Sequence, residues 1–254
     1  MTTHVTTLVS AELFKLRTTR TPWLLTVALA AAAVAVLAFN AALLGRAGQP
    51  ALEPSVIGDL ARAPGWLTGA VALLLGLLLS TAEYRHNTVL TTRLGYPRVP
   101  GLVLGKAVAA MLAGLALAVA VEIVMVGGTA AMLAYRGVAV EPWRHGVPAA
   151  VVATALVSAL YAVAGVGIGE LLRGPALALG AVFGTFMLQG VLPVLFHEPE
   201  LDRWLPNGAT ASALALGADT DGTLPVPWMG LLLLAAYAAG LLLAGLGRAA
   251  VTDP

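Results

Sequence analysis

Long runs of apolar residues, separated by short polar segments, make up most of this chain. Six runs have the length of a membrane-spanning helix: residues 22–44, 65–82, 107–135, 147–168, 175–196 and 226–247. A helix needs on the order of 20 mainly apolar residues to cross about 30 Å of hydrocarbon, and backbone in lipid must satisfy its own hydrogen bonds. The pattern therefore predicts an all-α integral membrane protein, with six transmembrane helices in a single domain over residues 1–254.

Composition supports this interpretation and excludes several classes of function. Of the 254 residues, 59% are hydrophobic and 11% are charged, against about 25% charged in a soluble domain. The chain has no basic block, so we expect no nucleic-acid partner. It has no cysteine, which rules out disulfides and thiolate metal sites.

The sequence also offers little for catalysis or for a bound cofactor. It lacks the G-x-x-x-x-G-K-[ST] phosphate loop, so we do not expect this chain to hydrolyse ATP in that manner. The four histidines, His4, His86, His145 and His197, lie in separate segments without metal-ligand spacing. We therefore expect neither an enzyme nor a cofactor or metal site.

The basic residues predict the orientation of the six spans. One side holds nine of the fourteen: Lys15, Arg17, Arg20, Arg85, Arg93, Arg98, Lys106, Arg173 and Arg248. The other side holds five: Arg46, Arg62, Arg136, Arg144 and Arg203. By the positive-inside rule both termini are cytoplasmic, in a multi-pass plasma-membrane protein. The first run has about 23 residues, longer than the 7–15 of a cleaved signal, so we expect a retained span.

The link between the fourth and fifth runs, residues 170–174, is unusually short. Its only charges are Glu170 and Arg173, and the surrounding glycines and Pro175 mark a tight turn. The two runs are therefore either separate spans or one re-entrant hairpin.

An amphipathic segment precedes the first run. Within residues 5–17, five apolar side chains fall on one face at helical spacing: Val5, Leu8, Val9, Leu13 and Leu16. Such a helix lies in the membrane interface. Glu12 interrupts this stripe three residues before Lys15, either as an i,i+3 ion pair or as a contact to a partner protein.

Residues 83–106 are expected to form the one sizeable loop on the cytoplasmic side. The loop begins with charges of both signs, including Glu83 and Arg85, and continues with a small apolar face. It is either a short helix along the membrane or a solvated turn. If Glu83 and Arg85 are exposed, reversing both charges leaves the fold intact, since exposed pairs contribute about 0–1 kcal/mol.

Three places in the sequence carry a family resemblance. They are residues 10–20 (SAELFKLRTTR); residues 82–88 (AEYRHNT) with YPR at 96–98 and GK at 105–106; and LP at 205–206 with PWMG at 227–230 and AY at 236–237. In this order the chain resembles the permease (membrane) subunit of a type-2 ATP-binding-cassette exporter, of the small six-span kind common in actinobacteria. Ala82 and Asn87 stand where the family usually has glycine.

The resemblance implies a function and partners. The permease would move a small amphiphile, antibiotic, peptide or lipid across the membrane, using ATP hydrolysed by two copies of a separate subunit. It would act as a homodimer, or as a heterodimer with a similar permease, in contact with membrane lipid. A short coupling helix would meet the ATPase, and the implied coupling residues are Glu83, Tyr84, Arg85, Thr88 and Arg98. Glu12, Lys15 and Arg17 would belong to the amphipathic elbow helix.

Two polar residues within the apolar runs are candidates for a translocation path. Glu122 lies inside the third run, and intramembrane carboxylates are costly. It either bonds to a neighbouring span, lines a cavity, or lies exposed at the outer interface if Gly127 and Gly128 end the span early. Gln189 in the fifth run either lines a path or packs between helices.

Two other classes of function fit much of the same pattern. A non-transporting membrane sensor or assembly anchor would have a similar sequence. A membrane-embedded enzyme would need several converging polar groups, and Glu122 alone is too few. An ATPase with a phosphate loop in the neighbouring reading frame would favour transport over both.

The charge distribution generates a test of topology. A reporter fused after Pro254 should be cytoplasmic, and one inserted near Asp219 should be external, because nine of fourteen basic residues sort to the first side. Reporter activity on each side of the membrane measures this. The same side for both reporters would contradict the six-span count and point to the 170–174 link.

Overall fold

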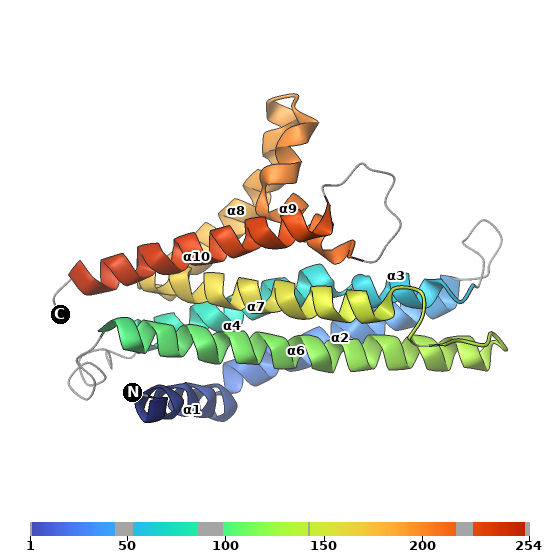
Figure 1. The fold of residues 1–254 in the computed structure, drawn as a ribbon, viewed down its shortest axis with the longest axis horizontal. Coiled ribbons are helices and arrows are strands. Elements are labelled where there is room, and N and C mark those ends of the chain that lie inside the picture. The colour runs from blue at the N-terminus through green and yellow to red at the C-terminus, as the bar shows by residue number, and fades with distance from the viewer. Residues whose placement is uncertain (1, 44–52, 86–98, 142, 217–225, 252–254) are drawn as a thin grey trace.

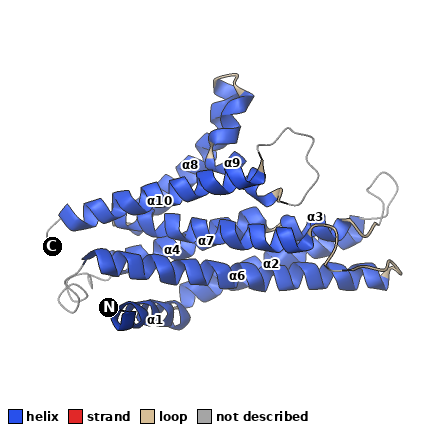
Figure 2. Cartoon of the chain, in the orientation of Figure 1, coloured by secondary structure: helices blue, strands red, loops and turns tan. Residues whose placement is uncertain are grey.

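The computed structural model describes residues 2–43, 53–85, 99–141, 143–216 and 226–251, with only the backbone of residues 2–6 and 199. The described residues form helices and contain no strand (Figure 2). Six helical segments are long and apolar enough to cross a membrane: α2 (Arg20–Leu43), α3 and α4 together (Val56–Arg85), α6 (Val99–Tyr135), α7 (Val147–Leu172), α8 (Pro175–Leu195) and α10 (Pro227–Val251). The prediction of an all-α protein with six long apolar helices is confirmed.

Several spans extend further than the apolar runs. The helix α4 (Gly65–Arg85) continues through Glu83, and α6 already includes Lys106, so neither residue lies in a loop as the sequence suggested. Glu, Arg and Lys are good helix formers, so the first charge marks a change of environment rather than the end of a helix. Before α4, the short helix α3 (Val56–Arg62) ends just ahead of Pro64, which has no backbone N–H to continue the helix.

The link at residues 170–174 is also shorter than expected. The helix α7 includes Glu170 and runs to Leu172, and α8 begins at Pro175. Arg173 adopts a left-handed conformation, with φ of 59°, and closes α7 through its backbone N–H to the Gly169 carbonyl. Two separate helices of 26 and 21 residues therefore flank the turn.

Small residues allow α4, α6, α7 and α10 to pack closely. A β-carbon at Gly76 of α4 would collide with the Ala162 carbonyl of α7, and one at Gly165 of α7 would collide with the Leu73 carbonyl of α4. Lipid-embedded helices gain van der Waals contact when small residues let their backbones approach. These helices form the bundle, and α7 lies at its centre, packed against α4, α6 and α10 (Figure 1).

The helix α6 is the longest element, with 37 residues and a length of about 55 Å. It runs straight through Gly127 and Gly128, so the glycine pair does not end the span. It packs antiparallel to α7 in one continuous register. Lys106 pairs with Glu170, and sixteen residues further along α6, Glu122 interacts with Thr154, sixteen residues back along α7.

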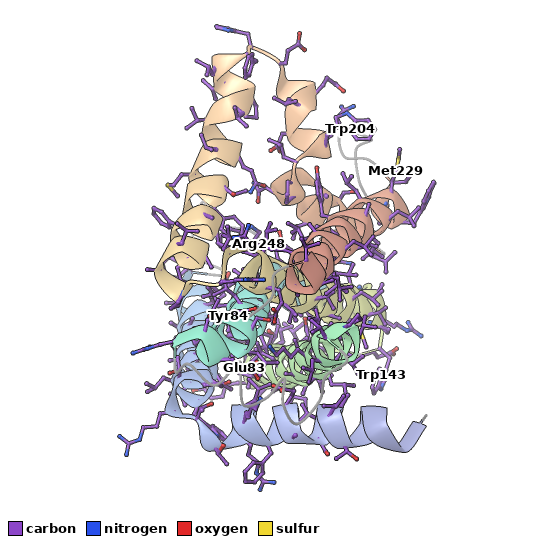
Figure 3. All side chains as sticks on the ribbon, turned by 90° about the vertical axis from the view of Figure 1, so that its left-hand side faces the viewer. Glu83, Tyr84, Trp143, Trp204, Met229 and Arg248 are labelled. Carbon is purple, nitrogen blue, oxygen red and sulfur yellow. The ribbon has the colours of Figure 1, made fainter. Side chains whose placement is uncertain are left out.

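Two helices do not follow the bundle axis. The helix α1 (Thr2–Thr18) lies crosswise at one end of the bundle, as the end-on view in Figure 3 shows. The helix α8 leaves the bundle at a steep inclination, and the chain returns through η1 (Pro199–Trp204) and α9 (Pro206–Leu214), which packs on α10 (Figure 1). The end that carries α1 also holds the last turns of α4, α7 and α10 and the first turn of α6.

Candidate functional site

Three carboxylates and two ammonium groups meet at the end of the bundle where α1 crosses. We refer to Glu12, Lys15, Glu83, Lys106 and Glu170 as the ion cluster. Its members come from α1, α4, α6 and α7, so one set of ion pairs joins four helices that are distant in sequence.

Lys106 is the buried centre of the ion cluster. Its Nζ atom lies 2.9 Å from Glu83 Oε2 and 2.8 Å from Glu170 Oε1. The side chains of Lys106, Glu83 and Glu170 are 5%, 9% and 3% exposed. A charge in such a position is tolerable only when it is paired and hydrogen-bonded. Lys106 meets that condition with one carboxylate from each neighbouring helix.

Lys15 extends the ion cluster to the crosswise helix. Its Nζ atom lies 2.7 Å from Glu12 Oε1 and 2.9 Å from Glu83 Oε1. The i,i+3 ion pair between Glu12 and Lys15 is thus confirmed, but Lys15 also binds α4. Glu83 consequently accepts hydrogen bonds from two lysines, one on each carboxylate oxygen.

The environment shifts the pKa of both α1 members. Burial raises the pKa of the Glu12 carboxyl above its usual value, and the hydrogen bond from Lys15 opposes this only in part. Burial alone would lower the pKa of Lys15, but hydrogen bonds to Glu12 and Glu83 outweigh it and raise the pKa. Lys15 therefore stays positively charged throughout the physiological range.

Tyr84 connects the ion cluster to the turn after α7. Its hydroxyl donates to Glu170 Oε2 at 2.9 Å. The Arg173 guanidinium lies over the Tyr84 ring, 5.6 Å from the ring centroid, in a cation–π arrangement. Arg173 also donates to the Arg248 carbonyl of α10 at 3.0 Å, so the contacts reach a fifth helix. Figure 3 shows Glu83, Tyr84 and Arg248 together at this end of the bundle.

This arrangement holds helix ends together. Each of its ammonium groups is hydrogen-bonded to two carboxylates. Among the residues that the structure describes, no group of three or more acidic, histidine or cysteine side chains is placed to hold a metal ion. The ion pairs link the four helix ends in series, α1 to α4, α4 to α6 and α6 to α7.

The residues proposed for coupling divide into three groups. Glu83 is buried and bound to two lysines, so the expectation that it is an exposed charge is wrong. Tyr84 is half-buried, and Arg85, the last residue of α4, is exposed. Thr88 and Arg98, with the rest of the expected coupling helix, lie outside the described residues. Arg17 is exposed, and its carbonyl accepts a hydrogen bond from the Trp23 indole.

Sequence reasoning did not find the pairing of Lys106 with Glu170. In the sequence Lys106 stands out only as a basic residue of the cytoplasmic side and of the GK motif, and Glu170 only as part of a link. The available signal is a charge at the same-side end of three apolar runs, acidic at Glu83 and Glu170 and basic at Lys106. Unpaired charges at such positions are expensive, so opposite charges in adjacent spans should seek each other.

Glu122 is buried rather than exposed at an interface. Its residue exposure is 3%, and neither carboxyl oxygen has a hydrogen-bond partner within the described part of the chain. The polar group that interacts with it is the Thr154 hydroxyl on α7. Of the three placements expected, interaction with a neighbouring span fits the contact to Thr154, and exposure at an interface does not. Glu122 lies about 24 Å along α6 from Lys106.

Gln189 belongs to a second polar group, at the junction of α8 and α9. Its side-chain oxygen accepts from the Asn207 backbone N–H at 2.7 Å, and its nitrogen donates to the Thr185 carbonyl at 3.2 Å. Asn207 in turn accepts from the Trp66 indole of α4 at 3.0 Å. Gln189 thus joins α8 to the start of α9, Asn207 joins α9 to α4, and Gln189 also lines a cavity beside α8.

The fold defines the chain as a multi-span membrane protein. The sequence matches no protein-family model and no curated protein.

The geometry of the ion cluster predicts an order of stabilities. Lys106→Met strands two buried carboxylates and should lower the free energy of unfolding by about 3–5 kcal/mol. Lys15→Met should cost less, because the Lys15 side chain is 44% exposed. Arg144→Met, which breaks the exposed pair with Glu141, is the matched control at about 0–1 kcal/mol. Unfolding in detergent, followed by intrinsic fluorescence, measures all three variants.

A combined variant separates charge from packing. Adding Glu83→Gln and Glu170→Gln to Lys106→Met removes the stranded charges and should recover much of the loss. Equal destabilisation in the triple variant and in Lys106→Met would show that packing of the lysine stem, not charge, is responsible.

Glu122 should behave differently from the ion cluster. Because no hydrogen bond of good geometry joins its carboxyl to the Thr154 hydroxyl or to another described residue, Glu122→Leu removes a buried polar group at the loss of one weak interaction. It should raise the free energy of unfolding by on the order of 1 kcal/mol, while Glu122→Gln should change it little. The unfolding assay in detergent measures both Glu122 variants. A clear loss of stability in Glu122→Leu would reveal a partner for the carboxyl.

Proposed function

We propose that this chain is the membrane-spanning subunit of an ATP-driven exporter of the type-2 ATP-binding-cassette class. It would work with a separate subunit that hydrolyses ATP, and the cargo would be a small amphiphile, antibiotic, peptide or lipid. Support comes from the six apolar helices, from the order of motifs that resembles such permeases, and from the ion cluster.

The ion cluster is the observation that carries the proposal. The segment that resembles the coupling stretch begins in the last turn of α4 and ends within the first turns of α6, at Gly105 and Lys106. These two helix ends bear Glu83 and Lys106, and through them α1 and α7 are attached. A force applied by an ATPase at this segment would move four helix ends together, because each ion pair resists separation in a low-dielectric setting.

The surface beside the ion cluster offers a place for the partner. A cavity of about 470 Å³ lies between α1, the start of α2 and the last turns of α4. Lys15, Glu83 and the exposed Arg85 contribute to its lining. A partner side chain inserted here would contact both the crosswise helix and the end of α4. The ATPase would therefore act on α1 and α4 at once.

The exposed faces of the bundle support assembly with a second membrane subunit. Only 11% of the α2 span and 17% of the α8 span are buried within the chain, against 61% of α7. The helix α8 exposes large apolar side chains such as Phe183, Met187 and Val194. In a transporter, two copies of this chain, or one copy and a similar permease, would enclose the path between such faces.

Charge reversal at Arg85 tests the coupling surface. Arg85→Glu should reduce recovery of the ATPase subunit with the tagged chain, and ATP-driven transport, by at least tenfold, because it repels a partner suited to a cation. Arg144→Glu, also exposed but at the opposite end of the bundle, should leave both unchanged. Affinity purification from membranes that co-express the neighbouring ATPase gives the recovery.

Two results would count against the proposal. Failure of the unmodified chain to bring down any ATP-hydrolysing protein would contradict the transporter assignment itself. Normal recovery and transport with Arg85→Glu would move the contact away from the end of α4 while leaving the assignment intact.

A further inference from the structure

A second cavity lies between the inclined helix α8 and the bundle. Its volume is about 550 Å³, within the range of sites that bind small molecules. Apolar side chains of α4, α7, α8 and α10 line it, among them Leu73, Ala164, Val182, Phe186 and Leu234. We refer to this space as the α8 cavity. It is half-enclosed and bounded by helices long and apolar enough to span a membrane.

The lining of the α8 cavity is almost entirely apolar. Among the described residues that line it, none is charged. Its four polar side chains each have a partner inside the protein: the Tyr161 hydroxyl with Thr210, the Thr185 hydroxyl with the Ala181 carbonyl, the Gln189 amide with Asn207 and Thr185, and the Tyr237 hydroxyl with the Trp204 carbonyl. A charged ligand would lose its hydration here without gaining an opposite charge.

We propose that the α8 cavity is a binding site for one acyl chain of a membrane phospholipid. Hydrocarbon is the ligand whose chemistry matches a lining that contributes only apolar contact, and the bilayer supplies it at high concentration. Because the walls carry no charge, the site recognises the tail and is indifferent to the head group. This inference does not depend on the transport function proposed above.

The size of the α8 cavity argues against a helix from a second copy as its occupant. An α-helix about 10–12 Å in diameter fills roughly 500 Å³ with each 5.4 Å turn. The α8 cavity therefore matches about one turn, whereas a spanning helix has more than five turns. A narrow, flexible chain fits such a space where a helix does not.

Retention of lipid by the purified protein tests the site. Native mass spectrometry of the full chain, released from detergent, should show one tightly held phospholipid per protein. Filling the α8 cavity with Ala181→Phe and Thr185→Phe, on two successive turns of the lining, should reduce the bound fraction at least tenfold. The matched control is Leu188→Phe with Val191→Phe, on exposed positions of α8 outside the lining, and it should keep the lipid.

A milder pair of substitutions guards against misfolding. Ala181→Leu with Thr185→Leu occupies less of the α8 cavity and should give an intermediate bound fraction at an unchanged unfolding midpoint. A graded loss with constant stability supports the site. Equal retention in the filled and control variants would overturn it, as would an unmodified protein that carries no lipid.

A second experiment tests whether binding in the α8 cavity is independent of the lipid head group. Hexadecanol, hexadecanoic acid and hexadecylamine share one tail and differ in charge at pH 7.5, and all three should displace the phospholipid at concentrations within about threefold of each other. A preference of more than tenfold for one of them would show recognition of a polar group and contradict the proposal. A third outcome would assign the α8 cavity to a second copy of the chain. In that case the unmodified protein would be a dimer without bound lipid, and the filled variant would be a monomer.

Discussion

The buried ammonium of Lys106 is the constraint on which the rest of this structure depends. A lysine at 5% side-chain exposure needs anionic partners, and it takes one from α4 and one from α7. Because the three groups must lie within hydrogen-bond distance, the ends of these helices are fixed relative to α6. Glu83 then uses its second oxygen for Lys15, which fixes the crosswise helix as well.

Apolar packing extends the alignment of α6 with α7 beyond the ion cluster. The register set by Lys106 and Glu170 is still kept at Glu122 and Thr154, about 24 Å along the helix pair. Between these levels, small residues such as Gly114 allow α6 to approach the α7 backbone at Ser158. Dispersion contacts alone permit helices to slide past one another, whereas an ion pair at one end selects a single register. Stability and alignment thus come from different parts of the interface.

The sequence predicted the number and class of the helices because length and apolarity suffice for that purpose. It did not predict their ends, since Glu83 and Lys106 interrupt the apolar pattern without interrupting the helix. It also could not identify which spans meet. When a helix is apolar on all sides, its sequence does not indicate which side faces a neighbouring helix. The partners Lys106 and Glu170 are moreover 64 residues apart. Nor does a local pattern predict the hydrogen bond from the Asn207 backbone of α9 to Gln189 of α8.

The ion cluster also bears on how the protein is synthesised and inserted into the membrane. The ribosome delivers its members in chain order: the α1 pair first, then Glu83, then Lys106, and Glu170 last. Before α7 emerges, the two lysines are already balanced by Glu12 and Glu83, but α4 and α6 lack the helix that packs against both of them. Glu170 then brings a third carboxylate to the two ammonium groups, so the arrival of α7 leaves the finished cluster with one excess negative charge at the end of the bundle.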